Sequence, residues 1–215
     1  MVHLREPFDH NKVLQNVAKE ILRPAGLVQK GRSRFWFADH GWWTVNVELQ
    51  PSGYDRGTYL NVGAMWLVYP AKHFAFHDGY RVESFAEARR PDQFEAAVRD
   101  MCTKAVAKVR EHEARIRNFA DAYRRTEELL KATETRHYSA TFWELYFPAV
   151  FAGLVGDVMR SRELAAQIEA SEDLYEWQQA GKKIAAQTLG AADLARKVEE
   201  HVSASRVALG LVRDN

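Results

Sequence analysis

Residues 42–50 decide the fold, and they read Trp-Trp-Thr-Val-Asn-Val-Glu-Leu-Gln. Apolar side chains occupy every second position from Trp43 to Leu49, and mostly polar ones lie between them. Because successive side chains of a strand point to opposite faces, this alternation predicts a β-strand with one face in a core. The residues expected on the core face are Trp43, Val45, Val47 and Leu49.

The flanking segments repeat the same period of two. It predicts further strands at 34–38 and 58–69 and a short fourth strand at 79–82, separated by turn-forming residues. Before them, apolar residues recur at helical spacing from Asp9 to Arg23, with Asp9 as the N-cap and Pro24 and Gly26 as the stop. The sequence therefore predicts a helix packed on one face of a small antiparallel meander.

The second half has a different period. From Asp92 to Phe147 the chain contains no Gly or Pro, and apolar residues recur every three or four positions. This predicts one long amphipathic helix, or two helices with a break near Asn118. A further helix is expected to begin at the capping box Thr141–Glu144. Three more are expected at 158–169, 173–189 and 192–211.

The predicted fold class is therefore α+β: an N-terminal helix plus a small antiparallel meander sheet, followed by a long helix and an α-helical bundle. We expect two domains, an α+β meander domain at 1–90 and a helical domain at 91–215 packed on it. The period changes from two to 3.6 at Pro91, which places this boundary.

Composition narrows the range of expected partners and cellular locations. The chain has 30 Lys and Arg against 29 Asp and Glu, and this balance argues against a protein that coats nucleic acid or an acidic membrane. Its single cysteine, Cys102, cannot form an internal disulfide, which is typical of a reducing compartment. The sequence shows neither a signal-peptide core nor a run of apolar residues long enough to span a membrane. We expect a soluble, cytoplasmic protein.

Two resemblances follow from short motifs. Residues 22–36, together with 47–52 and 59–63, resemble an uncharacterised bacterial family, domain of unknown function 4304, over roughly the first 85 residues. That family pairs an N-terminal helix ending in a Pro/Gly turn with strands ending in Gln-x-Ser and Asn-x-Gly, and it has no established chemistry. Residues 142–165 resemble one tetratricopeptide helical pair, without a second copy at the expected period of about 34 residues.

Patterns that carry catalysis are missing. His73 and His77 have the four-residue spacing of metal ligands, but no third ligand is evident. Cys102 falls on the apolar stripe of the long helix, where it is expected to pack in the core. No Gly-x-Ser-x-Gly motif and no phosphate-binding loop occurs. The sequence predicts no catalytic residue, no metal and no cofactor.

The polar face of the meander is the candidate binding site. Large aromatic residues, an arginine and several amides fall on positions that the alternation assigns away from the core, a composition typical of recognition surfaces. The expected binding residues are Arg34, Trp36, Trp42, Asn46, Glu48, Gln50, Tyr59 and Asn61. The competing interpretation is that the helical half folds over this face and buries it.

The hypothesis from sequence is a cytoplasmic bacterial protein-interaction module that binds a protein partner through the sheet face. An immunity or antitoxin role fits by analogy with small bacterial chains. No nucleic acid and no membrane is expected, and the oligomeric state is left open. The alternative is an enzyme or small-molecule-binding protein with a site between the sheet and the helical half, drawing on Arg34, Glu48, Arg136 and His137.

Overall fold

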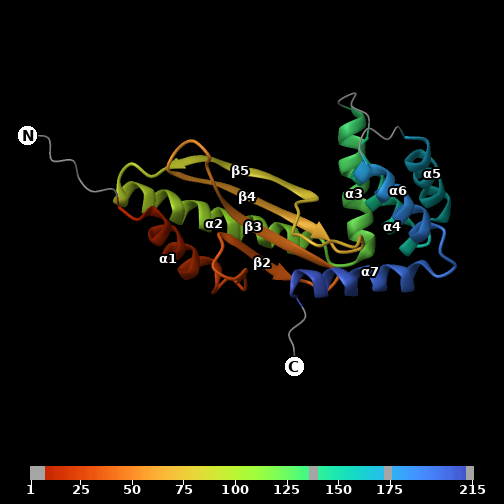
Figure 1. Cartoon of the computed structure of the whole chain (residues 1–215), viewed down its shortest axis with the longest axis horizontal. Coiled ribbons are helices and arrows are strands. Elements are labelled where there is room, and N and C mark those ends of the chain that lie inside the picture. The colour runs from red at the N-terminus through yellow and green to blue at the C-terminus, as the bar shows by residue number, and fades with distance from the viewer. Residues whose placement is uncertain (1–7, 136–139, 172–175, 212–215) are drawn as a thin grey trace, which may run out of the picture. The chain divides into compact units, whose positions relative to one another are not determined.

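The computed structural model describes residues 8–135, 140–171 and 176–211 (Figure 1). It has the predicted α+β class, with one helix, five strands and then helices. In chain order the elements are α1 (His10–Leu22), β1 (Val28–Gln29), β2 (Phe35–Asp39), β3 (Trp43–Pro51), β4 (Gly57–Trp66), β5 (Asp78–Glu87), α2 (Pro91–Arg115), α3 (Phe119–Thr135), α4 (Phe142–Leu154), α5 (Val158–Ala170), α6 (Glu176–Leu189) and α7 (Leu194–Leu209).

The chain forms two compact units. The first comprises Met1–His40, Thr44–Met65 and Asp78–His112, and the second comprises Gly41–Trp43, Trp66–His77 and Glu113–Asn215. The first unit thus holds α1, most of the sheet and most of α2, while the second holds the remaining helices. The domain boundary expected at 90/91 stays a prediction.

The sheet is a meander with strand order β1-β2-β3-β4-β5, so strands that follow each other in the chain are neighbours. The pairs β1–β2, β2–β3 and β4–β5 are antiparallel. The predicted core face of β3 is confirmed, because all four of its residues are buried: Trp43, Val45, Val47 and Leu49. Leu60, Val62 and Trp66 of β4 are buried too.

Two helices cover this core face in the first unit. α1 begins as expected, with the Asp9 carboxylate accepting the backbone N–H of Lys12. The Arg99 guanidinium of α2 donates to both carboxylate oxygens of Glu20 in α1, at 2.7 and 2.8 Å. Lys104 of α2 pairs with Glu83 of β5 at 2.6 Å. These contacts fix both helices on one side of the sheet and leave the other side without a helix of this unit.

The strands differ from the prediction at three places. β1 was not expected, β4 ends at Trp66 rather than at residue 69, and β5 runs over ten residues instead of 79–82. β5 pairs with β4 through register shifts near Leu60, which interrupt the simple alternation. Strands without a clean alternation carry a weak sequence signal, and β5 is one of them.

The helices follow the expected pattern closely. The segment after Pro91 forms two helices rather than one, because the chain breaks between Arg115 and Phe119. The side chain of Asn118 caps α3 by accepting the backbone N–H of Asp121 at 2.9 Å. The predicted start of α6 at residue 173 lies outside the described residues. No helix of the described ranges is long and apolar enough to cross a membrane.

The core of the second unit is aromatic. Trp42 stacks on Trp66 with ring centroids 6.0 Å apart and packs against Phe119 at 4.8 Å and Phe151 at 5.8 Å. α4 supplies most of the remaining core, including the fully buried Tyr146, whose hydroxyl donates to the backbone carbonyl of Val68. The helices of this unit are therefore assembled around α4.

Candidate functional site

Four of the predicted residues lie together on the sheet face that α1 and α2 do not cover. Glu48 and Gln50 come from β3, and Tyr59 and Asn61 come from β4. Each alternates along its strand with buried core residues, so all four side chains point to the same side. All are partly exposed.

Hydrogen bonds join these side chains across three strands. The Asn61 amide donates to the Gln50 carbonyl oxygen at 2.9 Å and to the Glu48 carboxylate at 3.2 Å. Arg81 of β5 donates to the same Gln50 oxygen at 2.9 Å. A polar network therefore runs from β3 through β4 to β5.

Aromatic rings complete the arrangement. The Arg81 guanidinium carbon lies 3.9 Å from the centroid of the Tyr59 ring, which is a cation–π contact. Phe85 packs on the same tyrosine, with ring centroids 5.0 Å apart. We call this group the Tyr59–Arg81 cluster; its members are Glu48, Gln50, Tyr59, Asn61, Arg81 and Phe85.

The cluster presents an ordered cation. Arg81 is exposed, yet its guanidinium is fixed by the Tyr59 ring below it and by Gln50 beside it. Beyond the bond to Gln50, the guanidinium makes no other hydrogen bond with the described residues. Its remaining N–H groups can donate to a carboxylate or carbonyl of a ligand. Because the side chain is already ordered, binding loses little of its conformational entropy.

Two predicted residues lie on the wrong face. Trp36 pairs with Val47 in the β2–β3 register and is only 1% exposed, so it belongs to the helix-covered core. Arg34, two residues earlier, points the same way and donates to the Asn11 side chain of α1. The prediction that both share a face with Asn46 and Glu48 is wrong. Phe35 and Phe37 occupy that face instead, because they pair with Glu48 and Asn46.

Two more predicted residues are not available on the open face. Asn46 is 0% exposed and its side chain accepts a hydrogen bond from Thr44 at 2.9 Å. Trp42 precedes β3 and packs into the aromatic core of the second unit. Of the predicted binding residues, those that remain on the open face are the four in the Tyr59–Arg81 cluster.

The residues of the alternative site do not come together. Arg34 and Glu48 point to opposite faces of the sheet, because residue 35, not residue 34, pairs with Glu48. Arg136 and His137 lie outside the described residues. The enzyme or small-molecule alternative therefore receives no support from this combination of residues.

Arg81 and Phe85 are the functional candidates that sequence reasoning missed. The pattern around 79–82 predicts a short strand but no faces, so it assigns neither residue to a side. The signal that could have found them is the even spacing of Gly79, Arg81 and Phe85, which places them on one face of a strand, although the pairing with β4 shifts register on both sides of Leu60.

The candidate metal and thiol residues have structural roles. The His77 Nδ1 atom accepts the backbone N–H of Trp66 at 3.0 Å, so this nitrogen is occupied, and His73 is exposed. Among the described residues, no group of three or more His, Cys, Asp or Glu side chains could hold a metal ion. Cys102 is buried as expected, and its burial raises the pKa of the thiol to about 12. A thiol with that pKa is a poor nucleophile.

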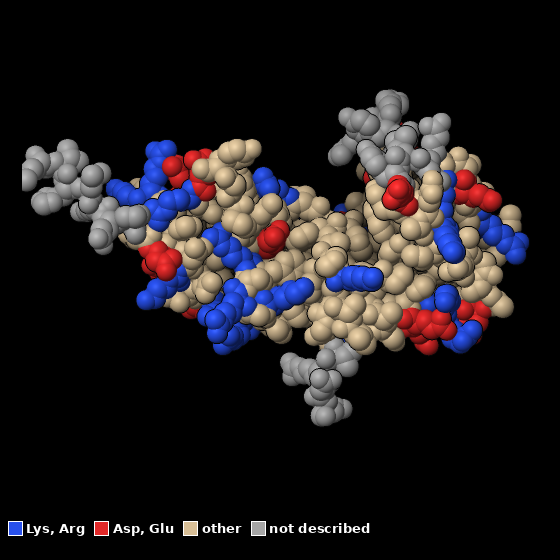
Figure 2. Space-filling view, in the orientation of Figure 1, with Lys and Arg blue, Asp and Glu red and all other residues tan. Residues whose placement is uncertain are grey.

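The charged side chains are unevenly distributed in the view shown. In Figure 2, Lys and Arg predominate over the lower part of the first unit, whereas both signs lie close together over the second unit. Many of them form pairs, such as Arg160 with Glu127 at 3.0 Å and Lys197 with Glu200 at 2.9 Å. This mixture is typical of an ordinary solvated surface.

Comparison with known family models, with curated proteins and with solved structures found no match to this chain. The resemblances to the uncharacterised bacterial family and to a tetratricopeptide pair therefore stay predictions. The candidate site rests on the geometry of the Tyr59–Arg81 cluster.

Proposed function

We propose that this chain is a cytoplasmic bacterial protein-interaction module that binds a protein partner through the Tyr59–Arg81 cluster. The observation that carries the proposal is the fixed Arg81 guanidinium, 3.9 Å above the Tyr59 ring on a sheet face that no helix of its unit covers. Arginine and tyrosine are the residue types that most often dominate binding energy at protein interfaces. The bacterial origin and the immunity or antitoxin type rest on resemblance and analogy alone.

The cluster defines the chemistry of the partner. Arg81 favours a carboxylate or a backbone carbonyl, because its outward N–H groups are donors only. Tyr59 and Phe85 offer an apolar surface beside it for an aliphatic or aromatic side chain. A protein segment that places an acidic residue next to a large apolar one fits both features.

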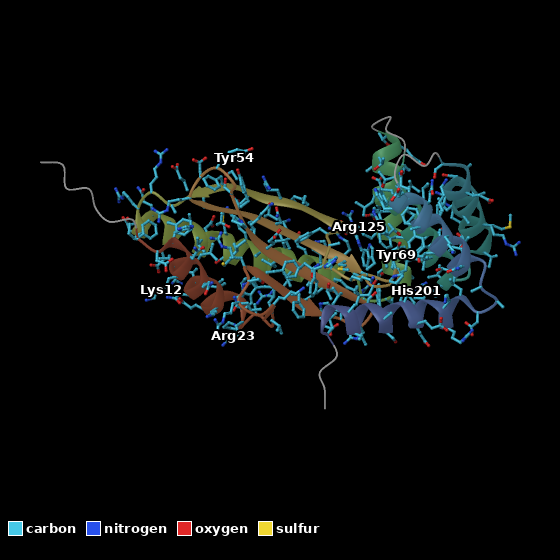
Figure 3. The ribbon with its side chains drawn as sticks, viewed as in Figure 1. Lys12, Arg23, Tyr54, Tyr69, Arg125 and His201 are labelled. Atoms are coloured by element: carbon cyan, nitrogen blue, oxygen red, sulfur yellow. The ribbon has the colours of Figure 1, made fainter. Side chains whose placement is uncertain are left out.

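The experiment starts with capture of partners from the native host and continues with one purified partner. Calorimetry then compares Arg81→Ala and Tyr59→Ala with two matched controls in the same unit. Tyr54→Ala removes a tyrosine that is 99% exposed in the β3–β4 loop (Figure 3), and Arg110→Ala removes an exposed arginine of α2. Each variant is first shown to be folded by circular dichroism.

We expect each cluster substitution to weaken binding by about 2 kcal/mol, roughly 30-fold in the dissociation constant. The two controls should change it by less than about 0.5 kcal/mol, because exposed side chains outside an interface contribute little. Equal effects of cluster and control substitutions would place the interface elsewhere.

A further inference from the structure

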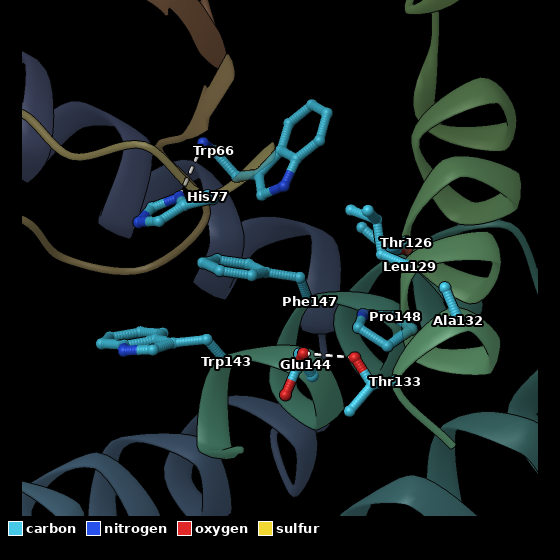
Figure 4. A pocket seen from close by; sticks show the side chains of 10 residues that line it. All are labelled: Trp66, His77, Thr126, Leu129, Ala132, Thr133, Trp143, Glu144, Phe147 and Pro148. Carbon is cyan, nitrogen blue, oxygen red and sulfur yellow. Dashed lines mark hydrogen bonds between the residues drawn. The ribbon is translucent and has the colours of Figure 1, made fainter. Parts of the chain in front are cut away.

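A cavity of about 250 Å³ lies within the second unit (Figure 4). One side is formed by α3, through residues such as Leu129 and Thr133, and another by α4, through Glu144 and Phe147. Trp66, at the end of β4, and His77 also line it. For comparison, an engineered apolar cavity of about 150 Å³ in another protein accepts benzene. The space here therefore suits a ligand of one or two rings.

Trp66 brings an unused donor to this cavity. Its side chain is 0% exposed, and its indole Nε1–H has no hydrogen-bond partner among the described residues. In Figure 4 the indole nitrogen lies on the edge of the ring that faces Phe147 and Leu129, and because this atom is itself buried, a ligand acceptor reaches it only after a small shift of those two side chains. Buried polar groups in native proteins are nearly always paired, so an unpaired donor at a cavity indicates a missing acceptor.

Glu144 brings an acceptor on another part of the wall. Its carboxylate accepts the Thr133 hydroxyl at 2.5 Å and the Thr141 backbone N–H at 2.7 Å. Burial by itself would raise the pKa of Glu144, but these hydrogen bonds outweigh it and hold the pKa below its ordinary value. The group is therefore ionised at neutral pH and can accept a further hydrogen bond from a ligand.

The remaining wall is flat and uncharged. The Phe147 ring stacks on Trp143, with centroids 5.6 Å apart and 16° between the planes, and His77 lies at 4.4 Å on Phe147 with a tilt of 35°. Burial lowers the pKa of His77 to about 3, so the imidazole is neutral. None of the ten described residues that line the cavity carries a positive charge. An anionic ligand would meet only the negative charge of Glu144.

We propose that this cavity binds a small, neutral, planar nitrogen heterocycle, with a ring acceptor on the Trp66 indole N–H and a ring N–H on the Glu144 carboxylate. The inference is independent of partner binding through the Tyr59–Arg81 cluster. It rests on a cavity of matching size, on one unpaired buried donor and on one ionised acceptor.

Benzimidazole is the first probe, because it carries one N–H donor and one nitrogen acceptor on a two-ring plane. Indane has nearly the same shape without hydrogen-bonding groups, and benzoate has a negative charge. Titrations of the full chain are followed by protein-observed NMR at mildly alkaline pH, where benzimidazole is neutral. We expect benzimidazole to bind about tenfold more tightly than indane, and benzoate not to bind.

Three variants locate the interaction. Trp66→Phe removes the indole N–H but keeps an aromatic ring. Glu144→Gln removes the charge and keeps one oxygen, which serves either the Thr133 hydroxyl or the Thr141 N–H but not both. Trp177→Phe is the matched control, because Trp177 stacks on Trp143, with centroids 6.2 Å apart, and does not line the cavity. We expect the first two to weaken benzimidazole binding about tenfold and the control to leave it unchanged.

Several results would overturn the proposal without any variant. One is equal affinity for benzimidazole and indane, and another is tight binding of benzoate. Absence of binding by all three probes would be a third such result. If Trp66→Phe does not fold, Glu144→Gln and the comparison of probes on the unchanged chain still test whether the cavity binds the heterocycle.

Discussion

His77 shows at the residue scale how one side chain serves both packing and hydrogen bonding. Its ring lies on Phe147, and its Nδ1 atom accepts the backbone N–H of Trp66 just where β4 ends. The hydrogen bond requires the neutral imidazole, because a protonated ring has no acceptor nitrogen. Burial accordingly lowers its pKa to about 3.

This shift predicts a pH-dependent stability. The unfolded chain takes up a proton on His77 as the pH falls below the ordinary value of 6.5, whereas the folded chain does so only near pH 3. The stability is therefore fully present above pH 6.5 and is lost as the pH falls through the window from 6.5 to 3. At about pH 5 the free energy of unfolding is lower by up to about 2 kcal/mol than above pH 6.5.

Urea unfolding of His77→Gln across this window tests the prediction. Glutamine keeps an oxygen for the Trp66 N–H but does not titrate, so the variant should show a flatter dependence of unfolding free energy on pH. His73→Gln, at an exposed position four residues earlier, is the control and should keep the slope of the unchanged chain. The same slope in all three proteins would contradict the burial of a neutral His77.

Single residues also explain where prediction of the site failed. In Phe35-Trp36-Phe37 every side chain is aromatic, so alternation alone does not tell which ring faces the core. The pairing of Trp36 with Val47 decides it, and that register depends on the neighbouring strand. By contrast, Glu48 and Gln50 alternate with Val47 and Leu49, and their face was predicted correctly.

At the scale of elements, the approach of β4 and β5 depends on two glycines. Gly63 and Gly79 face each other, and a Cβ atom on Gly63 would lie 2.4 Å from the Gly79 Cα and 2.7 Å from the Asp78 carbonyl oxygen. These are backbone atoms, so no side-chain rotation relieves the contact. The close pair sets the position of β5, and thereby the position of Arg81 beside Tyr59.

Gly63→Ala should therefore destabilise the chain by about 2 kcal/mol or more, as overpacking against backbone does. Gly53→Ala is the matched control, because a Cβ there meets no atom within 4 Å and the backbone angle is not in the left-handed region. It should change the unfolding free energy by less than about 0.5 kcal/mol. Thermal or urea unfolding of both variants gives the comparison, and equal stability would show that the strands can move apart freely.

Whole elements were predictable where one period extended over many residues. The α1 helix, the β3 strand and the helices after Pro91 all follow a regular apolar pattern and a cap or stop signal. β1, with two residues, is too short to show a period. β5 carries a register irregularity, which hid both its length and the two cluster residues on it.

At the scale of the whole molecule, the two units carry two different kinds of candidate site. The first unit presents the Tyr59–Arg81 cluster on an open sheet face, where a flat, ordered surface suits a protein partner. The second unit contains a cavity whose Trp66 donor and Glu144 acceptor suit a small molecule. The balanced charge of 30 basic and 29 acidic residues favours neither nucleic acid nor an acidic surface as the ligand of either unit.

Hydrogen–deuterium exchange of the unaltered chain with its purified partner tests the central claim most directly. Binding through the Tyr59–Arg81 cluster predicts slower exchange in peptides that cover residues 46–52, 57–63 and 79–87, because a bound partner restricts opening of these strands. Peptides from the outer surface of α7 should exchange as they do in the free chain. Slower exchange confined to α7, with β3, β4 and β5 unchanged, would contradict the claim.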